Sequence, residues 1–206
     1  MNGWPIVGWA TLVVLAIVAS ILAIVGTDHE GLGMAIRATA RTSVVLFTLA
    51  FAASALRRRW PNGATAWLLR NRRQLGVSFA ASHFVHLVLI IAVAGWTLEG
   101  FLTVRPMVTI VGGGLAYVFL ALMTLTSFDT TAAWLGPRNW RRLHVTGGYY
   151  NWFIFAQSFF VMALKSKSLI YWPFAALVAG AMVVRWLPAP RALSTGAGVR
   201  RTAMQS

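Results

Sequence analysis

The chain contains six apolar stretches, each about as long as a helix that crosses a lipid bilayer. Crossing the hydrocarbon layer takes about 20 helical residues. The stretches cover residues 4–25, 36–56, 74–96, 107–125, 143–164 and 169–187. Short polar or basic segments separate them, and we expect a short interfacial helix within the connection 126–142. The pattern predicts an all-α fold, a six-helix transmembrane bundle.

Composition supports a membrane protein and excludes several other classes. Of 206 residues, 58% are hydrophobic and 11% are charged, and this leaves too little polar surface to cover a soluble core. The net charge of +14 comes from basic clusters between apolar stretches, where lipid headgroups explain it better than nucleic acid does. The absence of cysteine excludes iron–sulfur clusters and covalent heme attachment. A redox centre would need His, Met, carboxylate or amide ligands, or a non-covalent organic cofactor.

The distribution of basic residues predicts that both termini are cytoplasmic. Under this topology 13 of the 18 Lys and Arg residues fall inside and five fall outside, as the positive-inside rule requires. The five outside are Arg37, Arg41, Arg105, Lys165 and Lys167. We expect one transmembrane domain over residues 1–187, followed by a flexible basic tail over residues 188–206.

Two histidines lie deep in the third apolar stretch. His83 and His86 are three residues apart, so they share a helix face, roughly 13 and 18 Å from the start of that helix. Ionisable residues at such depth are expensive and usually functional. They could ligate heme or a metal, or they could hydrogen-bond to neighbouring helices through groups such as Ser82 or Ser78.

Two further polar residues are candidates for the same chemistry. His144 follows Arg141 and Arg142 at the start of the fifth stretch, where it could be a ligand or a contact to lipid headgroups. Arg41 lies inside the second stretch and favours an anionic partner, either a heme propionate or one of the acids Asp28 and Glu30. His29 falls in a predicted outer connection and is interpreted as a solvated surface residue.

Three segments carry a resemblance to a known family. They are TARTSVVLFTLAFAASALRR at 39–58, RRQLGVSFAASHFVHL at 72–87 and LTSFDTTAAWLGPRNWRRLH at 125–144. In order and spacing, residues 5–187 resemble the ferric reductase-like transmembrane family. The closest similarity is to the heme-binding membrane subunit of the periplasmic methionine-sulfoxide reductase system. The resemblance implies a multi-pass protein of the bacterial inner membrane that holds heme b and passes electrons across the bilayer.

The same resemblance assigns ligands, and the chain departs from them at one position. It implies that His86 ligates heme near the outer side and that His144 is the first of two ligands thirteen residues apart. The second position holds Gln157 instead of histidine; by depth it is level with His86, where it would be a weak amide ligand or no ligand at all. His86 and His144 differ in depth by roughly 15 Å, whereas two axial nitrogens on one iron are about 4 Å apart. One or two hemes are therefore possible, with His83 as an alternative ligand or a brace for His86.

Two functions follow as hypotheses. In the first, the chain is an electron-transfer subunit that takes electrons from a cytoplasmic flavin reductase or from quinol and delivers them to a periplasmic reductase. The chain has no nucleotide-binding motif of its own, so a partner must bring any flavin, while the basic segments 57–73 and 138–142 would bind an acidic partner or anionic lipid. In the alternative, the chain has lost heme and acts as a membrane scaffold or partner-binding subunit.

Overall fold

The computed structural model describes residues 2–104, 106–166 and 168–188. These residues form nine α-helices and one short 3-10 helix, and no strand occurs among them. The elements are α1 (Pro5–Val25), α2 (His29–Arg59), α3 (Gly63–Arg70), α4 (Arg72–Val93), α5 (Leu98–Val104), α6 (Met107–Leu125), α7 (Asp129–Leu135), α8 (Pro137–Lys165), η1 (Leu169–Tyr171) and α9 (Trp172–Trp186). The all-α prediction is confirmed for this part of the chain.

Five helical segments of the described chain are long and apolar enough to cross a membrane. They are α1, α2, α4, α6 and the segment Leu169–Trp186 that joins η1 to α9. The predicted fifth stretch lies within α8, which has 29 residues but begins with a basic turn containing Arg138, Arg141 and Arg142. The structure thus gives a multi-pass all-helical protein with five candidate spans.

Several predicted connections are helical, which corrects the expected boundaries. The second long helix begins at His29 instead of residue 36, because the Asp28 carboxylate caps its first turn by accepting from the Gly31 N–H. Within the expected basic loop 57–73, Asn62 and Thr65 form a reciprocal capping box that starts α3. The expected loop after residue 96 contains α5, and α4 ends at Val93. The short helix expected within 126–142 is present as α7, whereas the predicted tail beyond residue 188 lies outside the described residues.

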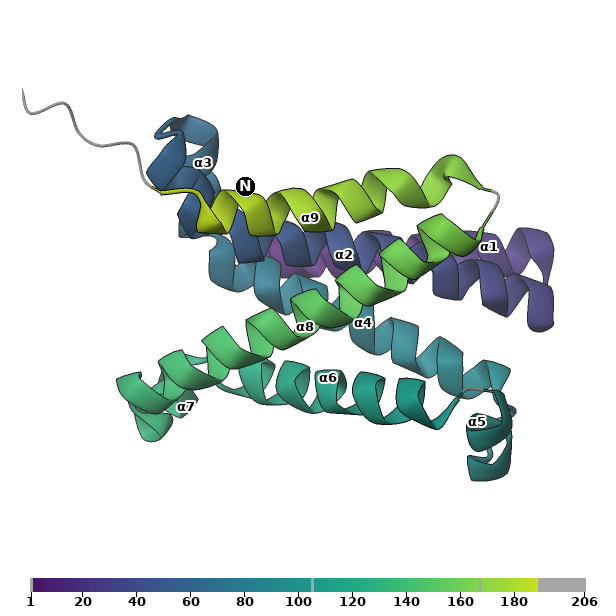
Figure 1. The fold of residues 1–206 in the computed structure, drawn as a ribbon. Helices are drawn as coiled ribbons and strands as arrows, with labels where there is room; N and C mark the ends of the chain where they lie inside the picture. The colour runs from purple at the N-terminus through teal and green to yellow at the C-terminus, as the bar shows by residue number, and fades with distance from the viewer. Residues whose placement is uncertain (1, 105, 167, 189–206) are drawn as a thin grey trace, which may run out of the picture.

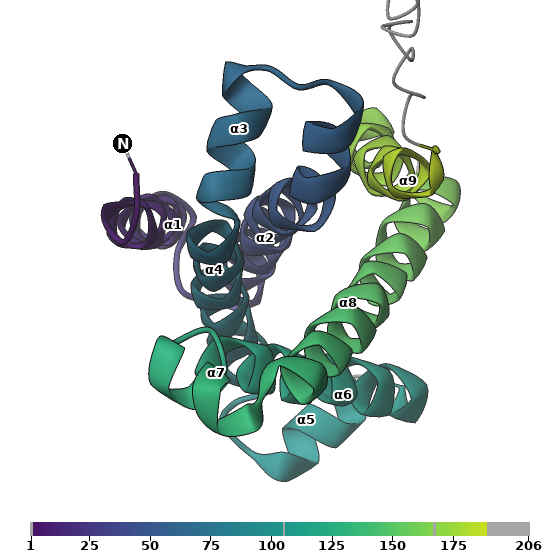
Figure 2. The same cartoon turned by 90° about the vertical axis from the view of Figure 1, so that its left-hand side faces the viewer.

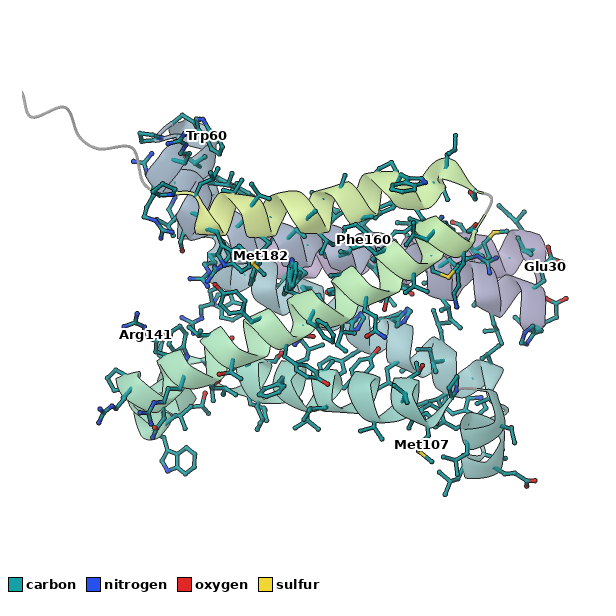
Figure 3. The ribbon with its side chains drawn as sticks, in the orientation of Figure 1. Glu30, Trp60, Met107, Arg141, Phe160 and Met182 are labelled. Carbon is teal, nitrogen blue, oxygen red and sulfur yellow. The ribbon has the colours of Figure 1, made fainter. Side chains whose placement is uncertain are left out.

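The long helices form a bundle whose two ends differ. α2 packs against α1, α4 and α9, while α8 packs against α6 and α9 and crosses the bundle obliquely (Figures 1 and 2). α3 and α7 lie at one end and α5 lies at the other, so we call these the α7 end and the α5 end. The side chains of Trp60 and Glu30 mark where α2 reaches each end (Figure 3).

Aromatic side chains fill the centre of the bundle. Phe47 lies between Phe51, Phe79 and Phe155, with ring centroids 5.2, 5.2 and 5.3 Å away. Such offset and edge-on contacts are favourable beyond the area that they bury. The cluster joins α2, α4 and α8 on the side of the cavity described below.

Candidate functional site

A cavity of about 700 Å³ opens between α2, α4, α6 and α8 in the half of the bundle toward the α5 end. It follows α2 from His29 to Arg41, about 18 Å at the rise of an α-helix. This volume is in the range of small-molecule and cofactor sites. Its described lining is mostly apolar, contains no Asp or Glu, and includes His29, His83, His86, Arg37 and Arg41.

His83 forms the deep end of this cavity together with two aromatic rings. Its imidazole stacks on Tyr117 of α6 with ring centroids 4.9 Å apart, and it lies 5.3 Å from Phe155 of α8. The Tyr117 hydroxyl donates to the His83 carbonyl at 3.1 Å, which fixes α6 against α4 at this level. The His83 side chain is 9% exposed, and its Nδ1 has no hydrogen-bond partner. Buried polar atoms in folded proteins normally have a hydrogen-bond partner, so an unsatisfied one requires an explanation, such as a missing ligand.

His86 lies one turn further toward the α5 end, and the main chain of α2 orients its ring. Its Nδ1 is 3.0 Å from the Ile36 carbonyl oxygen and 3.0 Å from Thr39 Oγ1. A carbonyl oxygen can only accept, so the bond to Ile36 requires the proton on Nδ1 and leaves the ring's lone pair on Nε2. This is the usual arrangement of a metal-ligating histidine, whose other nitrogen donates to a carbonyl or carboxylate.

A seam of hydroxyl groups holds α4 in register with α2. Ser82 Oγ is 3.0 Å from Thr42 Oγ1 and 2.9 Å from Ser43 Oγ, and all three groups lie between the two helices. Hydrogen bonds of this kind hold helices together in membranes, where apolar side chains gain little by leaving lipid. The seam lies next to His86 and limits movement of its helix relative to Ile36 and Thr39.

Arg41 lines the cavity without an acidic partner. The only ion pair among the described residues joins Arg73 to Asp129, so neither predicted acid, Asp28 or Glu30, pairs with Arg41. Glu30 extends away from the bundle at the α5 end (Figure 3). The Arg41 guanidinium carbon lies 5.6 Å from the Tyr171 ring centroid, and its Nε is buried without a hydrogen-bond partner. An anion in the cavity would complete its surroundings.

Two cavity residues were missed by the sequence analysis. His29 is exposed, as expected for a surface residue, but it also lines the cavity, and so does Arg37, which was considered only for topology. With Gly33 and Arg41 they occupy every fourth position of α2, which places them on one helix face. The spacing is present in the sequence. It was not recognised because the helix was predicted to begin at residue 36, which left His29 and Gly33 outside it.

His144 lies apart from the cavity. Its Nε2 is 3.1 Å from Thr126 Oγ1, and its ring stacks on Trp140 with centroids 4.1 Å apart. Thr126 Oγ1 itself donates to the Leu122 carbonyl at 2.7 Å, so it accepts from His144 Nε2. The structure thus brings His83, His86 and Arg41 together and leaves His144 outside this group.

Gln157 also lies outside the cavity, on an exposed face of α8. The neighbouring Ser158 lines the cavity instead, together with Ile154 and Met162. Depth along a helix depends on residue number alone, whereas successive side chains turn by about 100°. The expected position opposite His86 is therefore not occupied by Gln157 in this structure.

The donor set limits which metal chemistry the described residues could support. No group of three or more His, Asp or Glu side chains that could hold a metal ion occurs in the described parts of the chain. A heme iron receives four ligands from its porphyrin and needs only one or two from the protein. The single oriented imidazole of His86, beside two arginines, fits that requirement.

Comparison with known proteins adds no identification: no family model, curated protein or solved structure matches the chain.

Proposed function

We propose that the chain is a six-span membrane protein of the bacterial inner membrane with both ends cytoplasmic. α8 would be the sixth span, since 29 helical residues extend about 43 Å and the hydrocarbon core is about 30 Å thick. Among the described residues, ten Lys and Arg lie in the half toward the α7 end and three lie in the half toward the α5 end. This distribution supports a cytoplasmic α7 end and a periplasmic α5 end.

We further propose that the cavity holds one heme b, whose iron His86 would hold. The observation that carries the proposal is the imidazole of His86, whose Nδ1 is bound to the Ile36 carbonyl while the residue lines a cavity of cofactor size. His83 would brace the ligand or replace it. Arg41, together with Arg37, would pair with the propionates.

The residues of the chain would perform separate tasks around this cofactor. When bound, heme supplies reversible one-electron chemistry. His86 would hold the heme. The rings of His83, Tyr117 and Phe155 would exclude water from the side toward the α7 end. Arg41 would neutralise negative charge in a low-dielectric site. His144 has its Nε2 engaged by Thr126, so we propose a single heme.

Electrons would enter at the α7 end and leave at the α5 end. The proposed donor is a cytoplasmic flavin reductase or quinol, and the proposed acceptor is a periplasmic reductase. The first turns of α8 support binding of an acidic partner or anionic lipid, because Arg138, Arg141 and Arg142 line a second hollow of about 620 Å³. Arg141 extends from α8 at this end (Figure 3).

Visible spectra of the detergent-purified protein test the proposal. The protein is expressed with heme supplied, and the oxidised and dithionite-reduced forms are recorded with a pyridine-hemochrome assay. Sharp reduced bands of b type, which also appear on addition of a quinol or a flavin reductase with its reductant, are the expected result. A colourless protein would contradict the electron-transfer function and leave the alternative of a heme-free scaffold.

A further inference from the structure

Three consecutive glycines interrupt the apolar sequence of α6, and two of them face the cavity. Gly113 and Gly114 line it, and a Cβ atom added at either position would meet no atom within 4 Å. Packing against other helices therefore does not require glycine there. At Gly147, in contrast, an added Cβ would lie 2.9 Å from Met123 Sδ. Glycine inside a helix is unfavourable relative to Ala or Leu, so bare backbone at these two positions needs another reason.

The level of these glycines in the bundle is fixed by a contact deeper in the cavity. Tyr117 and His83 stack on each other and are joined by the hydrogen bond from the Tyr117 hydroxyl. One turn toward the α5 end from Tyr117, α6 reaches Gly113 and Gly114. One turn in the same direction from His83, α4 reaches His86. The glycines and His86 therefore lie at the same level on helices that border one cavity.

A second observation points to a ligand in this cavity. His83 lines it, is 9% exposed, and has a ring nitrogen with no hydrogen-bond partner. The same cavity thus combines an orphaned imidazole nitrogen with helix backbone that no side chain covers.

We propose that Gly113 and Gly114 are ligand-binding residues, whose bare backbone forms the wall against which a flat macrocycle packs opposite His86. The inference rests on the proposed function and extends it, because it assigns a contact surface to residues outside the predicted ligand set. Glycine carries no side chain, so these two positions would supply contact surface and no ligand. The two glycines instead leave room for the macrocycle, because larger side chains at these positions would occupy its volume.

Substitution by leucine separates ligand space from helix stability. Gly113→Leu places a good helix former in open space, so the heme-free protein is expected to melt at the same or a higher temperature than wild type. Its heme content per chain is expected to fall at least tenfold. Gly113→Ala adds one methyl group and is expected to give a smaller loss. The matched control is Gly180→Leu in α9, where an added Cβ also meets nothing within 4 Å and the residue does not line the cavity.

Heme content and thermal melting are measured in parallel for wild type and the three variants. A coloured wild type with an equally coloured Gly113→Leu variant would overturn this inference and leave the proposed function intact. A colourless wild type would overturn both. A Gly113→Leu protein that fails to fold, while Gly180→Leu folds, would also overturn the inference, because the space would then be needed by the protein itself.

Discussion

Two of the three histidines predicted as ligands, His86 and His144, have opposite kinds of surroundings. His86 has Nδ1 held by the Ile36 carbonyl and lines a large cavity, whereas His144 has Nε2 bound to Thr126 and its ring covered by Trp140. Both lie in long helices beside polar neighbours. At His86, the main chain of α2 orients a ring that lines the cavity. At His144, the hydrogen bond from Nε2 to Thr126 and the stacked ring of Trp140 take up the imidazole.

Two arginines repeat this contrast. Arg41 has a buried Nε without a partner, whereas Arg185 donates to the Phe51 carbonyl at 2.8 Å and to the Tyr149 hydroxyl at 3.4 Å. Buried polar groups in folded proteins are normally satisfied, and incomplete ones need an explanation. The cavity in the half toward the α5 end thus contains two incompletely bonded polar side chains, Arg41 and His83, whereas His144 and Arg185 are bonded by other residues of the chain.

The largest effect is expected for His86→Ala. This change removes an imidazole that lines the cavity and whose Nδ1 is held by the Ile36 carbonyl, so heme content per chain is expected to fall more than tenfold in a pyridine-hemochrome assay. His83→Ala is the comparison: it removes the neighbouring ring on the same helix face and is expected to give a smaller loss, because His83 would brace the site while His86 holds the heme. Equal loss in both variants, or loss only in His83→Ala, would contradict the assignment of His86.

Arg41→Gln is expected to weaken heme binding without unfolding the protein. A hydrogen bond to a charged group is worth about 1.5–3 kcal/mol, which corresponds to roughly tenfold or more in affinity. Hemin titration of the heme-free protein gives the dissociation constant, and thermal melting is expected to be unchanged. Arg185→Gln is expected to behave in the opposite way, with a lower melting temperature and unchanged affinity. Reversal of these two phenotypes would remove the distinction between the halves.

His144→Ala is expected to affect stability and not heme. Loss of its hydrogen bond to Thr126 and its contact with Trp140 should cost about 1 kcal/mol of unfolding free energy, in the range measured for polar contacts in membrane bundles. Urea or thermal denaturation in detergent measures this, and heme content is measured on the same sample. A fall in heme content at unchanged stability would restore His144 as a ligand.

Gln157→Ala is expected to have the smallest effect. The residue is exposed and outside the cavity, so stability should change by no more than about 0.5 kcal/mol and the reduced spectrum should not shift. Ser158→Leu is the comparison, since Ser158 lines the cavity and leucine there would intrude on it. A spectral shift in Gln157→Ala would show that the amide reaches the iron.

The sequence was sufficient to predict which segments form long helices. It was insufficient to predict which residues face the cavity. Runs of apolar residues define spans because lipid leaves the backbone no other way to satisfy its hydrogen bonds. The early start of α2 depends on the Asp28 cap, and with it the spacing of His29, Arg37 and Arg41 along one face becomes apparent. For Gln157, the depth in the membrane could be inferred from its position along the helix. The side of α8 on which it lies could not, because that depends on how α8 crosses the bundle. The proposed role of Gly113 and Gly114 depends on the open space beside them, which can be recognised only from the three-dimensional packing.

The most direct test of the account is the stoichiometry of heme binding. Heme-free protein in detergent is titrated with hemin, and the Soret absorbance is followed against equivalents per chain. A single sharp break at one equivalent, preserved in His144→Ala and absent in His86→Ala, is the predicted result. A break at two equivalents, or a signal that rises without saturation, would contradict the claim that one oriented cavity in the α5 half is the heme site.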